Sequence, residues 1–105
     1  MYERRVVFSV GVVYQTSYQK LTKIPEIIKN IIENQEPTRF DRAHFKEYGS
    51  YALNFEIVYW VESPDYNVYM DIQQSINLEI YQQFEGEGIE FAYPSQSIYV
   101  SDLSS

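Results

Sequence analysis

Residues 51–62 carry the strongest strand signal in the chain, an unbroken alternation of apolar and other side chains. Every second residue is apolar or aromatic, which is the period of a strand with one buried face. The members of that face are Tyr51, Leu53, Phe55, Ile57, Tyr59 and Val61. The alternation predicts a strand at the centre of a sheet. Other strands must then pair with both of its edges, and another layer must cover its apolar face.

Two further segments are predicted to supply neighbouring strands. Residues 5–14 place valine, phenylalanine and tyrosine on one face and are partly apolar on the other, which is typical of a central strand. Residues 39–48 are more polar, with aromatic residues set among charges, which suits an edge position.

Two helices are predicted from isoleucine and aromatic residues at helical spacing, over residues 18–35 and from about residue 65 to residue 84. Pro25 is acceptable only near a first turn or at a kink, so the regular part of the first helix is expected to start as late as residues 22–24. Gly86 or Gly88 is expected to end the second helix in the left-handed conformation.

The stretch after the second helix alternates again and predicts a strand over residues 89–93. Pro94 follows and removes a donor from any ladder. A second short strand, predicted at residues 96–100, is rich in β-branched and aromatic residues and would expose free hydrogen-bonding edges. Either the chain itself covers those edges, or other chains do.

The predicted order is strand, helix, strand, strand, helix, strand. That order is typical of the ferredoxin-like βαββαβ sandwich, an α+β fold with two helices on one sheet and its first and third strands at the centre. An extra short strand follows at the carboxy terminus. We therefore expect a ferredoxin-like domain over residues 1–94 and an assembly strand with its tail over residues 95–105.

Composition narrows the possible functions. The 105 residues carry 8 basic and 15 acidic side chains, a net charge of −7, which disfavours binding to nucleic acid or to an anionic membrane surface. The absence of cysteine excludes a disulfide framework and a cysteine-ligated metal site. No apolar run reaches the roughly 20 residues of a membrane-spanning helix, so the chain taken alone is expected to be soluble.

Few residues suggest catalysis. His44 is the single histidine, and an acid–base pair or metal site would need it together with Asp41 or Glu47. On a regular strand, Phe40 and Arg42 share its face. Glu85 and Glu87 form a second acidic cluster, which a solvated helix end explains better than a site does. Without a nucleophile triad, phosphate loop or metal box, we expect no enzyme activity, no cofactor and no metal.

Three segments together resemble the cytoplasmic domain of the MscS family, the small-conductance mechanosensitive channels. The segments are residues 5–14, residues 42–45 with residues 48–61, and the terminal motif Ile-Glu-Phe-Ala-Tyr-Pro-Ser-Gln-Ser-Ile-Tyr-Val at residues 89–100. Ile76, Asn77 and Phe84 in the second predicted helix also match. The resemblance covers nearly the whole chain in the family's order. It implies a non-enzymatic domain below the cell membrane, on the cytoplasmic side, in a channel that releases solutes during osmotic stress.

The resemblance also implies a partner, which is the chain itself. In this family the subunits form a homoheptamer, and the carboxy-terminal strands join in a parallel β-barrel. The residues that carry this role by resemblance are Gln96, Ser97, Ile98, Tyr99 and Val100. An alternative reading, from fold analogy alone, is a ferredoxin-like regulatory module that binds a small ligand between subunits. A small enzyme of the same fold would need a convergent polar cluster in a pocket, which the sequence does not offer.

Overall fold

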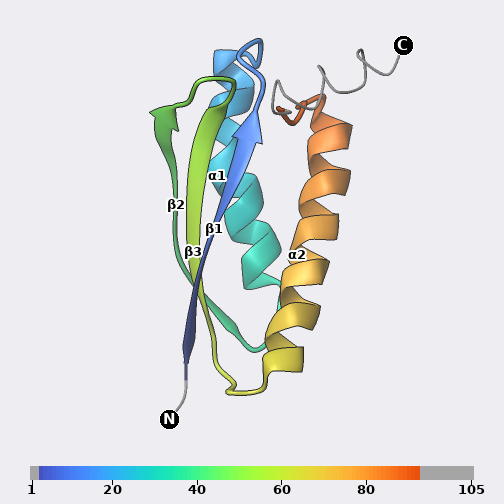
Figure 1. Cartoon of the computed structure of the whole chain (residues 1–105). Helices are drawn as coiled ribbons and strands as arrows, with labels where there is room; N and C mark the ends of the chain where they lie inside the picture. Colours follow the sequence, from blue (N-terminus) through green and yellow to red (C-terminus); the bar gives the residue numbers. More distant parts are fainter. Residues whose placement is uncertain (1–2, 93–105) are drawn as a thin grey trace, which may run out of the picture.

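The computed structural model describes residues 3–92, which form one three-stranded sheet and two helices. The strands are antiparallel, and both helices cover the same face of the sheet (Figure 1). This confirms the predicted α+β class. In chain order the elements are β1 (Arg4–Val12), α1 (Tyr18–Glu33), β2 (Thr38–Tyr48), β3 (Leu53–Val61) and α2 (Tyr66–Glu87).

The strand β3 lies between β1 and β2, as its alternation predicts. The side chains that alternate toward the helices are at most 3% exposed, because the helices cover that face along its whole length. Those side chains are Leu53, Phe55, Ile57, Tyr59 and Val61. Tyr51, predicted on the same face, lies in the turn before β3 and is exposed.

The strand β2 forms one edge of the sheet, as predicted. Its pairing with β3 shifts register twice, between Phe40 and Arg42 and between Phe45 and Glu47. Such bulges twist an edge and interrupt its row of hydrogen-bonding groups. Together with the exposed charges of β2, they hinder pairing with a further strand.

The prediction that the first strand is central is wrong for the described residues, because β1 forms the other edge of the sheet. Beyond it, the described part of the strand predicted over residues 89–93 forms a single antiparallel bridge, between Phe91 and Val12. The helix-free face of β1 is only partly apolar and is open to solvent: it carries Arg5, Val7 and Ser9, and Val7 is 46% exposed. Apolar residues on both faces therefore did not require a neighbour on both edges. The extra strand predicted at residues 96–100 lies outside the described residues.

The first helix begins at Tyr18, as the range 18–35 predicts, and not as late as residues 22–24. Ser17 caps it by accepting a hydrogen bond from the Lys20 backbone N–H, and the helix continues unbroken through Pro25. A proline within a helix removes one backbone donor, which costs about 3 kcal/mol. Burial of the helix against the sheet opposes this cost. The buried residues are Ile24, Ile28, Ile31 and Ile32.

The second helix begins and ends as the sequence predicts. Asp65 caps its start by accepting a hydrogen bond from Asn67 N at 2.9 Å. Its end is Gly88, whose φ of 73° is the left-handed conformation that glycine adopts without strain. Its buried side chains recur every four residues and face the sheet and α1: Ile72, Ile76, Ile80 and Phe84.

Tyr59 makes stability sensitive to alkaline pH. Its ring is fully buried, its hydroxyl donates to Gln73 Oε1 at 2.7 Å, and burial raises the pKa of the phenol well above its ordinary value. Above about pH 10 the unfolded chain releases a proton that the folded chain keeps, so the free energy of unfolding falls as pH rises.

We expect Tyr59→Phe to make the fall in unfolding free energy shallower by up to about 1.4 kcal/mol per pH unit above pH 10. Urea unfolding at several alkaline pH values, followed by the fluorescence of the single tryptophan Trp60, measures this slope. Tyr48→Phe is the control, because it removes the same hydroxyl from a tyrosine at the surface, where Tyr48 is 76% exposed. Equal slopes for wild type and Tyr59→Phe would contradict the prediction.

Candidate functional site

The segment that leads from α2 toward the predicted assembly strand is held at both ends of its described part. We call residues 88–92 the exit segment. At its start, Gly88 N donates to Glu85 O at 3.1 Å and Ile89 N donates to Phe84 O at 2.8 Å. These bonds satisfy carbonyls at the end of the helix and turn the chain back toward the sheet. Ile89 enters the core and is 4% exposed.

The exit segment then pairs with the end of β1. Val13 N donates to Glu90 O at 3.1 Å, and Ala92 N donates to Gly11 O at 3.0 Å, on either side of the bridge from Phe91 to Val12. The segment thus uses the outer edge of β1 only at that strand's last residues. These backbone bonds fix the last described residues of the exit segment against the end of β1.

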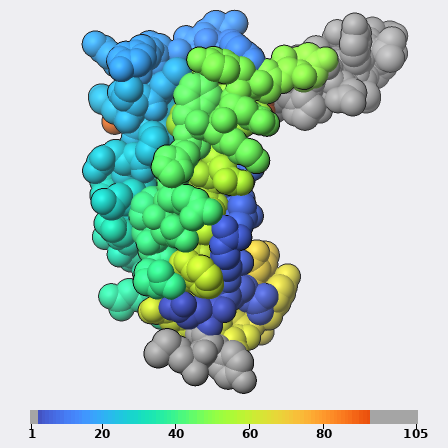
Figure 2. All heavy atoms as spheres, turned by 90° about the vertical axis from the view of Figure 1, so that its left-hand side faces the viewer, coloured from blue at the N-terminus to red at the C-terminus, as the bar shows by residue number. Residues whose placement is uncertain are grey.

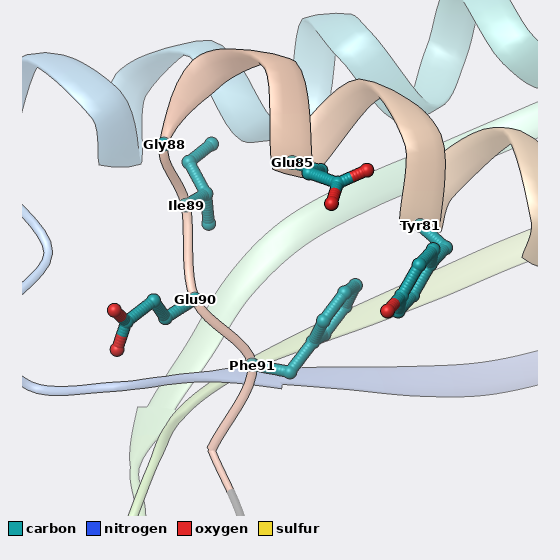
Figure 3. A pocket seen from close by; sticks show the side chains of 6 residues that line it. All are labelled: Tyr81, Glu85, Gly88, Ile89, Glu90 and Phe91. Carbon is teal, nitrogen blue, oxygen red and sulfur yellow. The ribbon is translucent and has the colours of Figure 1, made fainter.

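Aromatic stacking holds the exit segment against α2. The Phe91 ring lies 5.2 Å from the Phe84 ring and 6.1 Å from the Tyr81 ring, with interplanar angles of 14° and 5°. Figure 3 shows the Tyr81 and Phe91 rings side by side at the mouth of a hollow. Since Phe84 is fully buried, this stack joins the exit segment directly to the core.

The hollow beside this stack measures about 320 Å³. Glu85 projects over it, whereas the Glu90 carboxylate points away from the rings (Figure 3). Both glutamates are exposed, and the rest of the lining is the Tyr81 and Phe91 rings, Gly88 and Ile89. The described contacts at this hollow are those that hold the exit segment against α2.

The acidic cluster at the end of α2 is a solvated helix end. Glu85 and Glu87 are exposed, and Glu87 lies 3.6 Å from Lys23 Nζ in α1. Lys20 Nζ donates to the carbonyl of Gly88 at 3.0 Å, which places a cation at the negative end of the helix dipole. Among residues 3–92, no group of three metal-ligating side chains comes together.

His44 lies on the helix-free face of the sheet, opposite Glu56 of β3. The bulge between Phe40 and Arg42 puts Phe40 opposite Tyr59, on the helix side, so the prediction that Phe40 shares the face of His44 is wrong. A regular alternation cannot reveal this, because one inserted residue reverses the face of everything before it.

Of the two carboxylates considered as partners of His44, Asp41 makes contacts with other side chains and Glu47 lies opposite a different residue of β3. Asp41 accepts a hydrogen bond from Trp60 Nε1 at 3.2 Å and pairs with Arg42 at 3.2 Å. Glu47 lies opposite Asn54. The described contacts therefore build no acid–base pair around His44.

The arginine nearest the start of β2 is part of an ion pair. Arg39 Nη2 lies 2.8 Å from Glu3 Oε1, and its guanidinium also lies 5.0 Å from the centre of the Trp60 ring. The hydrogen bond from Arg39 lowers the pKa of the Glu3 carboxyl below its ordinary value. Arg39 is thus occupied within the domain rather than presented to an anionic partner.

The five residues predicted to assemble the oligomer, Gln96, Ser97, Ile98, Tyr99 and Val100, lie outside the described residues. The sequence reasoning did not identify the stack that anchors the segment before them. A signal for it exists: Tyr81 and Phe84 are three residues apart on a helix, and Phe91 follows on the buried face of an alternating stretch.

No helix among residues 3–92 is both long and apolar enough to span a membrane. Comparison with known proteins identifies the family to which the domain is similar. A family model described as "Mechanosensitive ion channel MscS, C-terminal" matches residues 6–91. A solved structure, the Helicobacter pylori MscS in its closed state, has the same fold with a TM-score of 0.61 and 23% identity, over 89% of this chain and 36% of that one.

Two relatives come from Methanocaldococcus jannaschii. The small-conductance mechanosensitive channel MscMJ is 40% identical over 98 residues, which are 92% of this chain and 28% of that protein. The large-conductance mechanosensitive channel MscMJLR is 36% identical over 102 residues, 91% of this chain and 28% of that protein. The chain thus spans less than a third of the length of these relatives. It belongs to the MscS mechanosensitive channel family, as that family's C-terminal domain.

Proposed function

We propose that this chain is the cytoplasmic assembly domain of an MscS-like mechanosensitive channel. The matched relatives are named as mechanosensitive channels, and this chain corresponds to the C-terminal part of such proteins. In this role it is non-enzymatic. It holds subunits together as a homoheptamer on the cytoplasmic side of the cell membrane and frames the passage of ions and solutes during osmotic stress.

The anchored exit segment is the observation that carries the proposal. Its backbone bonds with β1 come at alternate residues, since Glu90 accepts from Val13 and Ala92 donates to Gly11. In an antiparallel ladder the next residue with its N–H toward β1 is Pro94, which has none. Because Pro94 has no N–H where the ladder needs its next donor, the pattern favours a chain that leaves β1 after this point. We therefore propose that residues 95–105 pair with neighbouring subunits and not with their own domain.

In the proposed topology, the bridge at Phe91 is the remnant of the fourth strand of a ferredoxin-like sheet, in the order 4-1-3-2. The observed order β1-β3-β2 and the antiparallel bridge on the outer edge of β1 support this arrangement. The strand at residues 96–100 is then an addition to that fold. Pairing with copies of itself would satisfy its backbone edges.

The experiment is truncation of the full-length channel after Pro94, with a control that lacks only residues 102–105. Light scattering of the purified channel reports its mass, and survival of cells after hypo-osmotic shock reports its activity. We expect the truncated channel to lose subunits from the ring and to protect cells less, because the assembly strand is gone. The control is expected to behave as wild type. A truncated channel with unchanged mass and unchanged protection would refute the assembly role.

A further inference from the structure

The charges of this chain are distributed unevenly along its sequence. All eight basic side chains lie within residues 1–46, whereas residues 47–105 carry ten of the fifteen acidic side chains and no basic one. The helix α2 belongs to this acidic part. Figure 2 views the molecule from the side of β2, where α1 and β2, in cyan and green, cover most of the surface and α2 lies largely behind them. The acidic helix therefore presents its surface on another side of the molecule.

A row of five exposed side chains runs along the solvent side of α2. Its members follow one another at spacings of three or four residues, so they lie on one face of the helix. They are Met70, Gln74, Leu78, Tyr81 and Glu85, which we call the outer face of α2. Leu78 and Tyr81 are 61% and 62% exposed. The buried residues of the helix face the sheet and α1 instead.

The outer face exposes more apolar surface than a solvated helix needs. Single exposed hydrophobic side chains are normal on proteins, but three of the five positions in this one row carry a methionine, a leucine or a tyrosine. At the end of the row, Tyr81 and Glu85 border the hollow of about 320 Å³ beside Phe91. The face thus offers a partner an apolar row and, next to it, a recess that a side chain can enter.

The acidic groups along this face are not paired with basic groups. Asp71, one residue after Met70, and Glu85 are both exposed. Within the part of the chain that the structure describes, the acidic members of ion pairs are Glu3, Asp41, Glu56 and Glu87. Of these only Glu87 belongs to α2, and it pairs with Lys23 of α1 at the end of the helix. The negative potential of Asp71 and Glu85 is therefore directed to solvent.

We propose that the outer face of α2 is a docking surface for a basic amphipathic helix of another protein. Charge complementarity selects the partner, because an acidic face attracts lysine and arginine side chains and repels nucleic acid and anionic membranes. The spacing selects the shape, because a row of side chains three and four residues apart is what a second helix packs against. Met70, Leu78 and Tyr81 contact the apolar side of that helix, and the flanking carboxylates pair with its basic residues.

A second copy of this chain does not fit the same face. The lysines that a copy presents on a helix all lie on α1, and two of them already bind the end of α2 within their own chain. Lys20 Nζ donates to Gly88 O at 3.0 Å, and Lys23 Nζ lies 3.6 Å from Glu87. A copy also carries a net charge of −7 and is repelled. The inference goes beyond the proposed function and does not depend on how the subunits assemble.

The test is the binding of a designed peptide to the 105-residue chain. The probe is a fluorescently labelled helix of about 18 leucine and lysine residues, or five turns, with the leucines on one side. Fluorescence anisotropy measures its Kd. We expect Asp71→Lys and Leu78→Asn each to weaken binding about tenfold, because each removes one contact at the centre of the face. Glu33→Lys is the control, since it changes the net charge equally at an exposed position on α1, and we expect less than about a twofold change.

Three results would overturn the docking surface. Equal weakening by Glu33→Lys and Asp71→Lys would mean that net charge alone attracts the peptide. Equal binding of a peptide with the same composition in scrambled order would mean that no apolar face is recognised. In the full-length channel, a benzophenone amino acid at Leu78 that crosslinks two copies would show that the face is occupied by the chain itself. The three substituted positions are exposed, so the variants should fold as the wild type does, and urea unfolding checks this.

Discussion

Replacing Phe84 with alanine is expected to lower the free energy of unfolding by about 3–5 kcal/mol. The ring is fully buried at the last turn of α2 and stacks on Phe91 at 5.2 Å, so its removal leaves a cavity between the core and the exit segment. A loss of this size is a large part of the 5–15 kcal/mol that stabilises a typical domain. Urea unfolding of the chain, followed by Trp60 fluorescence, measures it.

A second substitution, Tyr81→Ala, distinguishes the effect of losing buried core volume from the effect of losing an aromatic contact with Phe91. Tyr81→Ala removes the other ring that stacks on Phe91, at 6.1 Å, from a position that is 62% exposed. We expect it to cost about 1 kcal/mol or less, because little buried area is lost. If Phe84→Ala were as mild as Tyr81→Ala, the end of α2 would not be part of the core.

The second large effect is a buried charge on the same helix. Ile76 is fully buried between α2 and the sheet, whereas Leu78, two residues later, is 61% exposed. Ile76→Asp is expected to prevent folding or to lower the unfolding free energy by several kcal/mol, because no partner is present for the carboxylate in the core. Leu78→Asp is expected to change it by no more than about 0.5 kcal/mol.

Circular dichroism and urea unfolding of the two aspartate variants, measured side by side, test this contrast. Both substitutions add the same charge to the same helix, and their helix propensities differ by only a few tenths of a kcal/mol, so a difference of several kcal/mol between them reports burial. Comparable stability of the two variants would mean that α2 does not present its isoleucine face to the sheet.

Much of the fold was predictable because its signals are local. The alternation of β3, the isoleucines of α1 and α2 and the glycine at the end of α2 each depend on neighbours within one element. Burial of one face produces a period that the sequence displays directly. The start of α1 was harder to predict, since the cost of Pro25 is balanced by packing of the helix against the sheet.

The candidate site was predicted only in part. The sequence indicated that a strand-like segment follows Gly88 and that Pro94 interrupts its ladder. It did not reveal that Phe91 stacks on Phe84 and Tyr81, or that the segment bonds only to the last residues of β1. These contacts join parts of the chain that are far apart in sequence, and residue spacing within one segment carries no information about them.

The sequence by itself determined the type and order of the elements, the apolar face of each and the acidic character of the chain. Only the tertiary structure decided that β1 lies at an edge of the sheet among the described residues, and that a bulge turns Phe40 and His44 to opposite faces. The physical reason is that a side-chain period arises from burial within one element. Edge positions, bulges and shared surfaces arise from pairing between elements, which depends on how the whole chain closes on itself.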